Sequence, residues 1–146
     1  MIPKQLIVRC ENGTNNILQL PFGTSLVDIK ASLPPTMIQE PRYGVQLYPM
    51  EYALLMVGPD YYRRDALEAR TCLASLRDVS PIVLAAIDGG HTTRAGRVAG
   101  ALRSIGREEM ADELLRMMRQ VGHAVTEENP FEENVRMVTF VESAYA

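Results

Sequence analysis

The sequence predicts an α+β fold, because short apolar runs of strand-like composition alternate with stretches whose apolar residues recur at helical spacing. Three observations carry this prediction. Residues 5–35 contain an alternating apolar pattern, an Asn-Gly pair and a double-proline stop. Compact apolar runs follow at 52–57 and 82–87, and both have the length of a buried strand. After residue 89, two amphipathic stretches meet at a single glycine.

The first segment predicts a β-hairpin. Residues 6–11 place Leu6, Val8 and Cys10 at every second position, which suits a half-buried strand. Asn12-Gly13 is a strong hairpin signal, since both residue types tolerate the positive φ of a tight turn. We therefore expect a return strand at residues 17–22.

A helix is predicted directly after this hairpin. Thr24 or Ser25 can cap it, and Pro34-Pro35 cannot continue it. The apolar residues at helical spacing are Leu26, Ile29 and Leu33. A β-hairpin followed at once by a helix is the opening of a ubiquitin-like (β-grasp) domain, a fold that hosts many unrelated functions.

The middle of the chain predicts the remaining elements of this domain. We expect a loop at 36–43, a short strand at 45–48 and a central strand at 52–57. A helix with one apolar face follows at 60–78, and Ser-Pro ends it. The run at 82–87 then predicts the last strand of the sheet, before a Gly-Gly pair.

The predicted domain organisation is therefore a ubiquitin-like domain over residues 1–88 and a helical-hairpin extension with a C-terminal strand over residues 89–146. Residues 92–105 carry an apolar stripe, and Gly106 ends that helix. A second amphipathic helix is expected at 107–121, with acids in its first turn and arginines in its last, as the helix dipole favours.

The C-terminal part also carries packing signals. Gly96 and Gly100 lie one turn apart, which predicts close packing of their helix on the sheet or on the next helix. The tail is acidic, and Pro130-Phe131 is a candidate packing anchor. Residues 135–142, VRMVTFVE, have strand composition, and we expect a final edge strand that pairs within the chain or with a partner.

Composition limits the classes of function. The net charge of −3 gives no general attraction to nucleic acid or anionic membranes. No run reaches the ~18 apolar residues of a membrane span, and the N-terminus lacks the apolar core of a signal peptide. Cys10 and Cys72 are expected to be buried free thiols rather than a disulfide. We therefore expect a cytoplasmic protein.

Motifs for catalysis or metal binding are missing from the sequence. His91 and His123 each flank a predicted helix, and no G-x-S-x-G nucleophile elbow is present. Residues 96–100 lack the Lys-Ser/Thr of a phosphate-binding loop, and the cysteines and histidines have no zinc spacing. Acidic clusters at 108–113 and 127–133 fit helix polarity and a surface loop. We therefore expect no enzyme, no cofactor and no metal.

Two groups of residues are candidates for partner binding. Arginines of the helix at 92–105 form a cationic face, which either docks a partner or pairs with the acids of the next helix. They are not interleaved with aromatic residues, so nucleic acid is not the expected partner. A Tyr-Tyr-Arg-Arg run opens the helix at 60–78, and these residue types are typical of interfaces. The candidate residues are Tyr61, Tyr62, Arg63, Arg64, Arg94, Arg97 and Arg103, with Arg107 on the same face as the last three.

Residues 3–88 resemble the adaptor-binding domain of class I phosphoinositide 3-kinase catalytic subunits. The residues that carry the likeness are Pro3, Leu6 to Cys10, Asn12-Gly13, Ile17 to Leu20, Thr24 to Leu26, Ile29-Lys30, Tyr52 to Met56, Glu68 to Leu73 and Ser80 to Leu84. The resemblance implies a ubiquitin-like fold that binds the coiled coil of a regulatory subunit and catalyses nothing itself.

A second, shorter likeness covers the predicted hairpin at 92–122. Val98 to Ser104 and Met110 to Leu114 resemble the last two helices of death-fold domains, which assemble with their own kind. About 55 residues follow Gly90, too few for the six helices of that fold, so the likeness is expected to extend to the hairpin alone.

The sequence therefore predicts a non-enzymatic protein–protein interaction module or signalling adaptor that binds a helical partner or self-associates as a homo-oligomer. Two alternatives remain open. One is a death-fold-like assembly adaptor. The other is a small ligand-sensing protein or enzyme whose pocket the sequence does not reveal.

Overall fold

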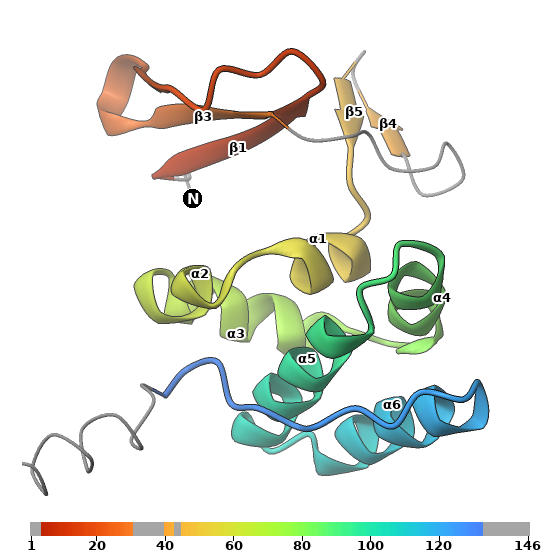
Figure 1. Cartoon of the computed structure of the whole chain (residues 1–146). Coiled ribbons are helices and arrows are strands. Elements are labelled where there is room, and N and C mark those ends of the chain that lie inside the picture. Colours follow the sequence, from red (N-terminus) through yellow and green to blue (C-terminus); the bar gives the residue numbers. More distant parts are fainter. Residues whose placement is uncertain (1–3, 31–39, 43–44, 133–146) are drawn as a thin grey trace, which may run out of the picture. The chain divides into compact units, whose positions relative to one another are not determined.

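The computed structural model describes residues 4–30, 40–42 and 45–132. These residues form a mixed α+β structure (Figure 1), as the sequence predicted. The chain divides into two compact units, residues 1–47 (unit 1) and 48–146 (unit 2). The sequence predicted a domain boundary after residue 88, whereas Asp88 is the last residue of a helix inside unit 2.

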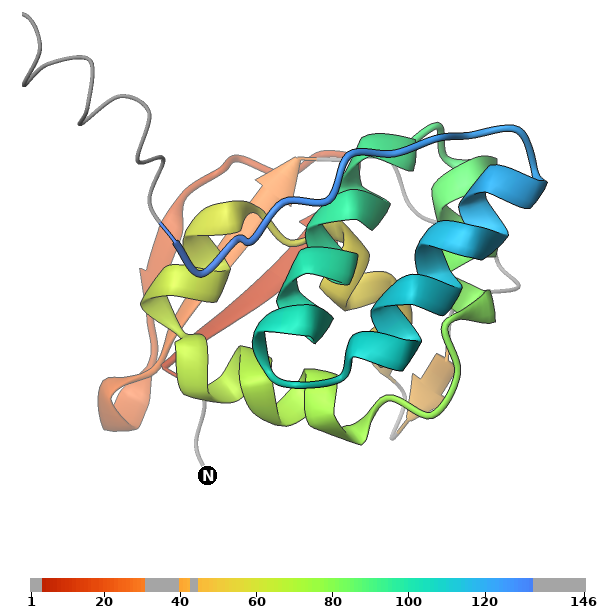
Figure 2. The same ribbon diagram turned by 90° about the horizontal axis from the view of Figure 1, so that it is seen from below.

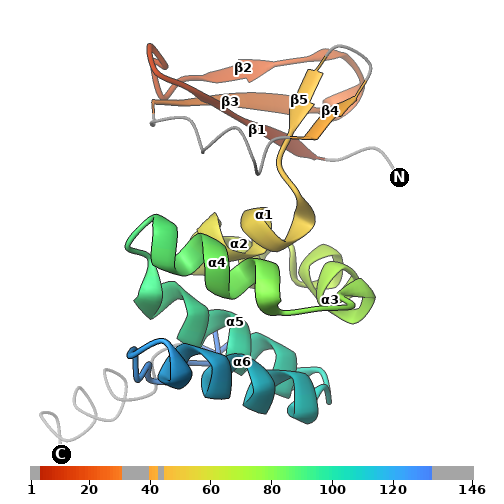
Figure 3. The ribbon, with the colours of Figure 1, turned by 90° about the vertical axis from the view of Figure 1, so that its right-hand side faces the viewer.

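Unit 1 contains a mixed sheet whose described strands are β1 (Gln5–Cys10), β2 (Ile17–Gln19) and β3 (Ser25–Lys30). Figure 3 shows β3 between the other two. It runs parallel to β1 and antiparallel to β2. The expected hairpin between the first two strands is therefore wrong, because each of them pairs with β3 instead.

The Asn-Gly pair forms a turn, but the strands on either side of it do not pair with each other. Gly13 N–H donates to the carbonyl oxygen of Cys10 at 3.1 Å. A Cβ on Gly13 would lie 2.6 Å from the backbone nitrogen of Lys30. The turn therefore folds tightly over the end of β3 and carries the chain to the far edge of the sheet, where residue 17 begins β2.

The helix expected from residue 24 or 25 to residue 33 is also wrong, because residues 25–30 form β3. Residues 31–33 lie outside the described residues. The helical spacing of Leu26 and Ile29 coexists with β-branched Val27 and Ile29, which favour a strand. Hydrogen bonds to β1 on one side and β2 on the other pair the backbone groups of this segment. This pairing with distant strands overrides the local helical spacing.

A second small sheet pairs β4 (Glu40–Arg42) with β5 (Val45–Leu47) in antiparallel register. The strand predicted at 45–48 is confirmed by β5. The segment expected as a loop at 36–43 contains β4.

Unit 2 is helical throughout its described secondary structure (Figures 1 and 3). Its helices are α1 (Met50–Met56), α2 (Pro59–Arg64), α3 (Ala66–Ser75), α4 (Ser80–Asp88), α5 (Thr92–Ser104) and α6 (Glu108–Gln120).

The strands expected at 52–57 and 82–87 are wrong, because these runs form most of α1 and α4. A short apolar run has no period that separates a buried strand from a buried helix. Both runs follow a proline, Pro49 and Pro81, at the start of a helix, a position where the missing N–H is not needed. That local signal favours the helices that the structure shows.

The single helix expected at 60–78 is divided into α2 and α3. Asp65, between them, has φ −117° and ψ 46°, which is not helical. Its N–H still donates to the carbonyl oxygen of Tyr61 at 2.8 Å, and its own carbonyl accepts from Ala69 at 3.0 Å. The break therefore turns the chain without leaving these groups unpaired.

The helical hairpin is confirmed by α5 and α6. Gly106 has φ +86° and Gly122 has φ +93°, so both helix-ending glycines adopt the left-handed conformation. Arg107 N–H donates to the carbonyl oxygen of Leu102 at 2.9 Å, and an equivalent bond closes α6. This arrangement is the Schellman motif that a glycine at this position favours.

The core of unit 2 is built from the inner faces of these helices. The largest side chains that are fully buried include Leu55, Tyr62, Leu73, Ile82, Val98, Leu102, Leu114 and Met118. Unit 1 contributes no large apolar side chain to the buried set within the described residues.

Candidate protein-interaction surface

Two arginines of the predicted cationic face lie against the carboxyl end of α1. Arg94 Nη1 donates to the carbonyl oxygen of Met56 at 2.9 Å, and Arg97 Nη1 donates to that of Val57 at 3.4 Å. The last carbonyls of a helix lack partners within it and carry partial negative charge. Both arginines therefore stabilise the joint between α1 and α5.

Arg107 has the same role at the end of α3. Its Nη1 donates to the carbonyl oxygens of Leu73 at 2.7 Å and Leu76 at 2.6 Å. The glycine turn after α5 places this guanidinium beside the carboxyl end of a helix that lies about 30 residues earlier in the sequence. The Nη1 donor of Arg107 is therefore used within unit 2 and is not available to a partner protein.

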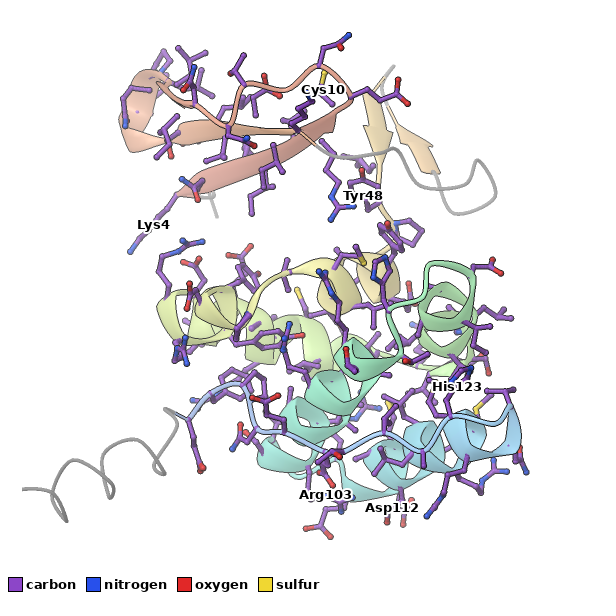
Figure 4. All side chains as sticks on the ribbon, viewed as in Figure 1. Lys4, Cys10, Tyr48, Arg103, Asp112 and His123 are labelled. Atoms are coloured by element: carbon purple, nitrogen blue, oxygen red, sulfur yellow. The ribbon has the colours of Figure 1, made fainter. Side chains whose placement is uncertain are left out.

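Arg103 links three segments of unit 2. Its Nη2 donates to Asp112 Oδ1 on α6 at 2.5 Å, and its Nε donates to Glu127 Oε1 in the tail at 2.6 Å. Figure 4 shows Arg103 and Asp112 side by side. These hydrogen bonds, that of Glu127 first, raise the pKa of Arg103 above its ordinary value. The pairing of the arginine face with acids of the next helix, one of the two expected readings, is therefore present at Arg103.

The Tyr-Tyr-Arg-Arg run lies on α2, and its members have different environments. Tyr62 is 0 % exposed, and its hydroxyl donates to the carbonyl oxygen of Leu54 at 2.7 Å. Tyr61 is half-buried, with its ring edge-on to that of Tyr62. Burial raises the pKa of both phenols above the ordinary value for tyrosine. Tyr62 is a core residue in this conformation.

Arg63 and Arg64 remain at the surface. Arg63 contacts Asp60 at 2.5 Å, and Arg64 contacts Asp65 at 3.0 Å. Leu67, beyond the break at Asp65 and at the start of α3, is 74 % exposed. We call Tyr61, Arg63, Arg64 and Leu67 the α2–α3 corner. It combines half-buried aromatic, cationic and apolar groups within seven residues of chain.

The acidic tail contacts α5 directly. Residues 123–132, here called the strap, cross this helix as an extended chain that ends in a turn at residues 130–132 (Figure 2). A Cβ on Gly96 would clash with the carbonyl oxygen of Thr126, and one on Gly100 with that of Glu128. The close packing expected at these glycines is therefore present, but the neighbour is the strap rather than the sheet or α6.

The end of the strap confirms the expected anchor at Pro130-Phe131. Pro130 is buried. The ring of Phe131 stands edge-on to that of Tyr62, with centroids 5.5 Å apart and planes at 88°. The guanidinium carbon of Arg70 lies 4.9 Å from the centroid of the same ring. The strand expected at 135–142, beyond this anchor, lies outside the described residues.

A surface hollow of about 490 Å³ lies between the start of α5 and the strap. Its lining residues are Thr92, Thr93, Gly122, His123, Ala124, Val125, Thr126 and Glu128. His123 is exposed (Figure 4), and its backbone N–H closes α6. Within the described part of the chain, no group of three or more Cys, His, Asp or Glu side chains is placed to hold a metal ion.

Both cysteines are free in the structure. Cys10 is exposed, so the expectation that it is buried is wrong. Cys72 is half-buried, and burial raises the pKa of its thiol, with Glu68 adding to the effect. Among the described residues, no helix has the length and apolar character needed to cross a bilayer.

Comparisons with protein-family models, with curated proteins and with solved structures found no match to this chain.

Sequence reasoning found the residue types of these surfaces but not their partners. The spacing of Gly96 and Gly100 predicts that another segment packs closely on their helix, but it does not indicate which segment. Arg94 and Arg107 receive their roles from carbonyl groups at helix ends that no local pattern places beside them. Leu67 is exposed because it lies away from the face of α3 that buries Ala69 and Leu73.

Proposed function

We propose that this chain is a non-enzymatic protein-interaction module that binds a second protein through the α2–α3 corner. The observation that carries the proposal is the exposure of Leu67, 74 %, just beyond the helix break that follows two surface arginines and a half-buried tyrosine. Tyrosine and arginine are enriched among the residues that dominate binding energy, and an exposed apolar group beside them supplies area to desolvate.

The ion pairs of the corner favour a partner with acidic groups. Arg63–Asp60 and Arg64–Asp65 join residues close in sequence, with arginine side chains that are 37 % and 55 % exposed. Exposed pairs of this kind contribute roughly 0–1 kcal/mol, so carboxylates of a partner can replace them at low cost. A helix that presents apolar and acidic residues on one face fits this surface.

The arginines of α5 have a smaller part in this proposal than the sequence suggested. A docking role for Arg94, Arg97 or Arg103 requires their bonds within unit 2 to open. Tyr62 would have to leave the core. We therefore centre the proposed contact on Tyr61, Arg63, Arg64 and Leu67.

A death-fold-like assembly adaptor is the second candidate, and one observation favours it. Six helices lie between residues 50 and 120 of the described chain. Residues 50–88 supply four helices before the hairpin, so unit 2 has the six helices that the residues after Gly90 alone could not form. The ubiquitin-like assignment is not needed for either candidate, since both concern unit 2.

Two leucines provide a matched test of the proposed surface. Leu67→Glu changes the α2–α3 corner, and Leu84→Glu makes the same change at another exposed leucine, 66 % exposed on α4. The molar mass of the full chain is measured over a hundredfold concentration range, and proteins bound to each immobilised variant are compared. We expect Leu67→Glu to abolish a complex that Leu84→Glu retains. Equal binding by both variants contradicts the corner as the contact surface.

A further inference from the structure

We propose that the face of α5 beneath the strap is a recognition site for an extended acidic segment, and that a second copy of this chain fills it by exchanging residues 123–132. This surface consists of Gly96, Gly100 and Arg103, with Tyr62 and Arg70 at its far end. It shares no residue with the α2–α3 corner. The inference therefore holds or fails independently of the proposed function.

The spacing of the contacts matches an extended chain to a helix. Gly96 and Gly100 are four residues apart on α5, and their neighbours Thr126 and Glu128 are two residues apart on the strap. Four helical residues advance about 6.0 Å, and two extended residues advance about 6.6 Å. Two alternate carbonyl groups of the strap, those of Thr126 and Glu128, therefore lie against the two positions of α5 where glycine leaves room for them.

Polar contacts fix the register of the segment. Glu128 N–H donates to the carbonyl oxygen of Gly96 at 3.1 Å, so the backbone of α5 binds one backbone amide of the strap. Arg103 Nε donates to Glu127 Oε1 at 2.6 Å, so the site also binds an acidic side chain one residue before Glu128. A charge-assisted contact of this kind adds specificity as well as attraction.

An aromatic anchor completes the recognised pattern. Phe131 lies against the ring of Tyr62 and beneath Arg70, four residues beyond the carboxylate that Arg103 binds. Pro130, just before it, is buried and restricts the backbone. The site therefore accepts a segment that is extended around a glutamate at the position of 127 and then turns, with proline and phenylalanine at the positions of 130 and 131.

The chain itself supplies this segment, and its connection to α6 permits exchange. Gly122 ends the helix, and His123 and Ala124 are exposed before the strap reaches α5. Exchange between two copies would keep every strap contact and change only these few connecting residues, the low-cost route to a dimer. Because the tether keeps the local concentration of its own strap high, we expect exchange to become populated only at high protein concentration.

A pair of charge reversals in the full chain tests the exchange. Arg103→Glu and Glu127→Arg each place like charges opposite one another within a single copy. When the two variants are mixed, each site meets an oppositely charged strap from the other copy. We expect the mixture to form a heterodimer of twice the monomer mass while each variant alone stays monomeric. The double variant should stay monomeric, because its own strap matches again, but it should be less stable than the wild type, since the carboxylate introduced at position 103 faces Asp112.

The control uses a second arginine–glutamate pair that lies away from the strap. Arg116 and Glu113 lie 3.7 Å apart on α6, so Arg116→Glu mixed with Glu113→Arg reproduces every change in net charge. This control mixture should remain monomeric. A monomeric mixture of the strap variants, or equal association in the control mixture, overturns the proposal.

Arg103→Lys gives a second test with a milder change. A carbodiimide links the introduced amine to Glu127, and equal amounts of ¹⁴N- and ¹⁵N-labelled chains are mixed at high concentration before linking. We expect linked peptides that contain both labels. If both halves of every linked peptide carry the same label, the strap stays on its own copy and the proposal is overturned. This test remains decisive even if the charge reversals unfold the chain.

Discussion

The ring of Phe131 stands perpendicular to the ring of Tyr62, with centroids 5.5 Å apart, and joins the end of the strap to the core of unit 2. Tyr62 in turn bonds to the carbonyl oxygen of Leu54 near the end of α1. The contact therefore ties a segment near residue 130 to helices that lie 70 residues earlier in the sequence.

Removing the phenyl ring should loosen this connection. We expect Phe131→Ala to lower the free energy of unfolding of unit 2 by about 1–3 kcal/mol, from lost packing, the aromatic pair and the contact with Arg70. Denaturant unfolding followed by helical circular dichroism measures this change. Phe22→Ala is the matched control, because Phe22 is 93 % exposed in unit 1. Equal effects of the two changes would show that Phe131 is not an anchor.

A methyl group on Gly100 should displace the strap. The added Cβ would clash with the carbonyl oxygen of Glu128, whereas a Cβ on Gly58 would meet open space. We expect Gly100→Ala to speed hydrogen exchange at the Glu128 amide, and Gly58→Ala to leave it unchanged. Unchanged exchange in Gly100→Ala would mean that the strap shifts without leaving the helix.

The turn between α5 and α6 depends on a residue that tolerates a left-handed backbone. Gly106 has φ +86°, and a Cβ there meets no other atom, so strain alone decides the outcome. Gly106→Val should cost at least about 1–2 kcal/mol, as left-handed conformations do for residues with a side chain. The melting temperature measures the loss, with Gly58→Val as control. An unchanged melting temperature for Gly106→Val would contradict the prediction.

The apolar stripe of α6 should behave as a core element. Leu114 is 0 % exposed, so Leu114→Ala removes buried methyl groups and should cost roughly 2–5 kcal/mol. Leu84→Ala, at an exposed leucine of α4, should cost far less. Chemical denaturation of both variants distinguishes them. A cost below ~0.5 kcal/mol for Leu114→Ala would place this stripe outside the core.

The start of α4 should make stability depend on pH. Asp78 Oδ1 accepts from the backbone N–H of Ser80 at 2.9 Å and from its hydroxyl at 2.8 Å, and these bonds, the backbone bond first, lower the pKa of Asp78. A folded pKa below the unfolded value of 3.8 gives stability that is present above pH 3.8 and is lost as the pH falls through the folded pKa.

We therefore expect Asp78→Ala to lower the melting temperature at about pH 7, with the difference from wild type shrinking toward about pH 2. Ser80→Ala removes only the hydroxyl bond and should have a smaller effect of the same sign. A difference that stays constant across this range would show that the ionised carboxylate of Asp78 does not stabilise α4.

The helical hairpin could be predicted from sequence because its signals are local. Gly106 and Gly122 mark helix ends by a conformation that glycine alone adopts freely. The stripe that contains Leu114 repeats at a helical period over several turns. The strand at 45–48 and the anchor at Pro130-Phe131 were predicted on similar local grounds.

The runs at 52–57 and 82–87 could not be assigned correctly from their apolar content. Each is shorter than two full helical turns, and neither contains a charged residue that would show a period, even where a side chain such as Leu84 is exposed. The candidate arginines show the same limit at the level of function. Arg94, Arg97 and Arg107 look like a cationic surface until the helix ends that they bind are placed.

The sequence by itself determined the α+β class, the hairpin of α5 and α6, and the glycine positions that require close approach or a left-handed backbone. The tertiary structure alone decided that β3 lies between β1 and β2, that α1 and α4 are helices in a bundle, and that the strap covers α5. The physical reason is the range of the interactions. Caps and glycine conformations are determined within a few residues, whereas strand pairing and the partners of half-buried arginines depend on segments that meet only when the chain folds.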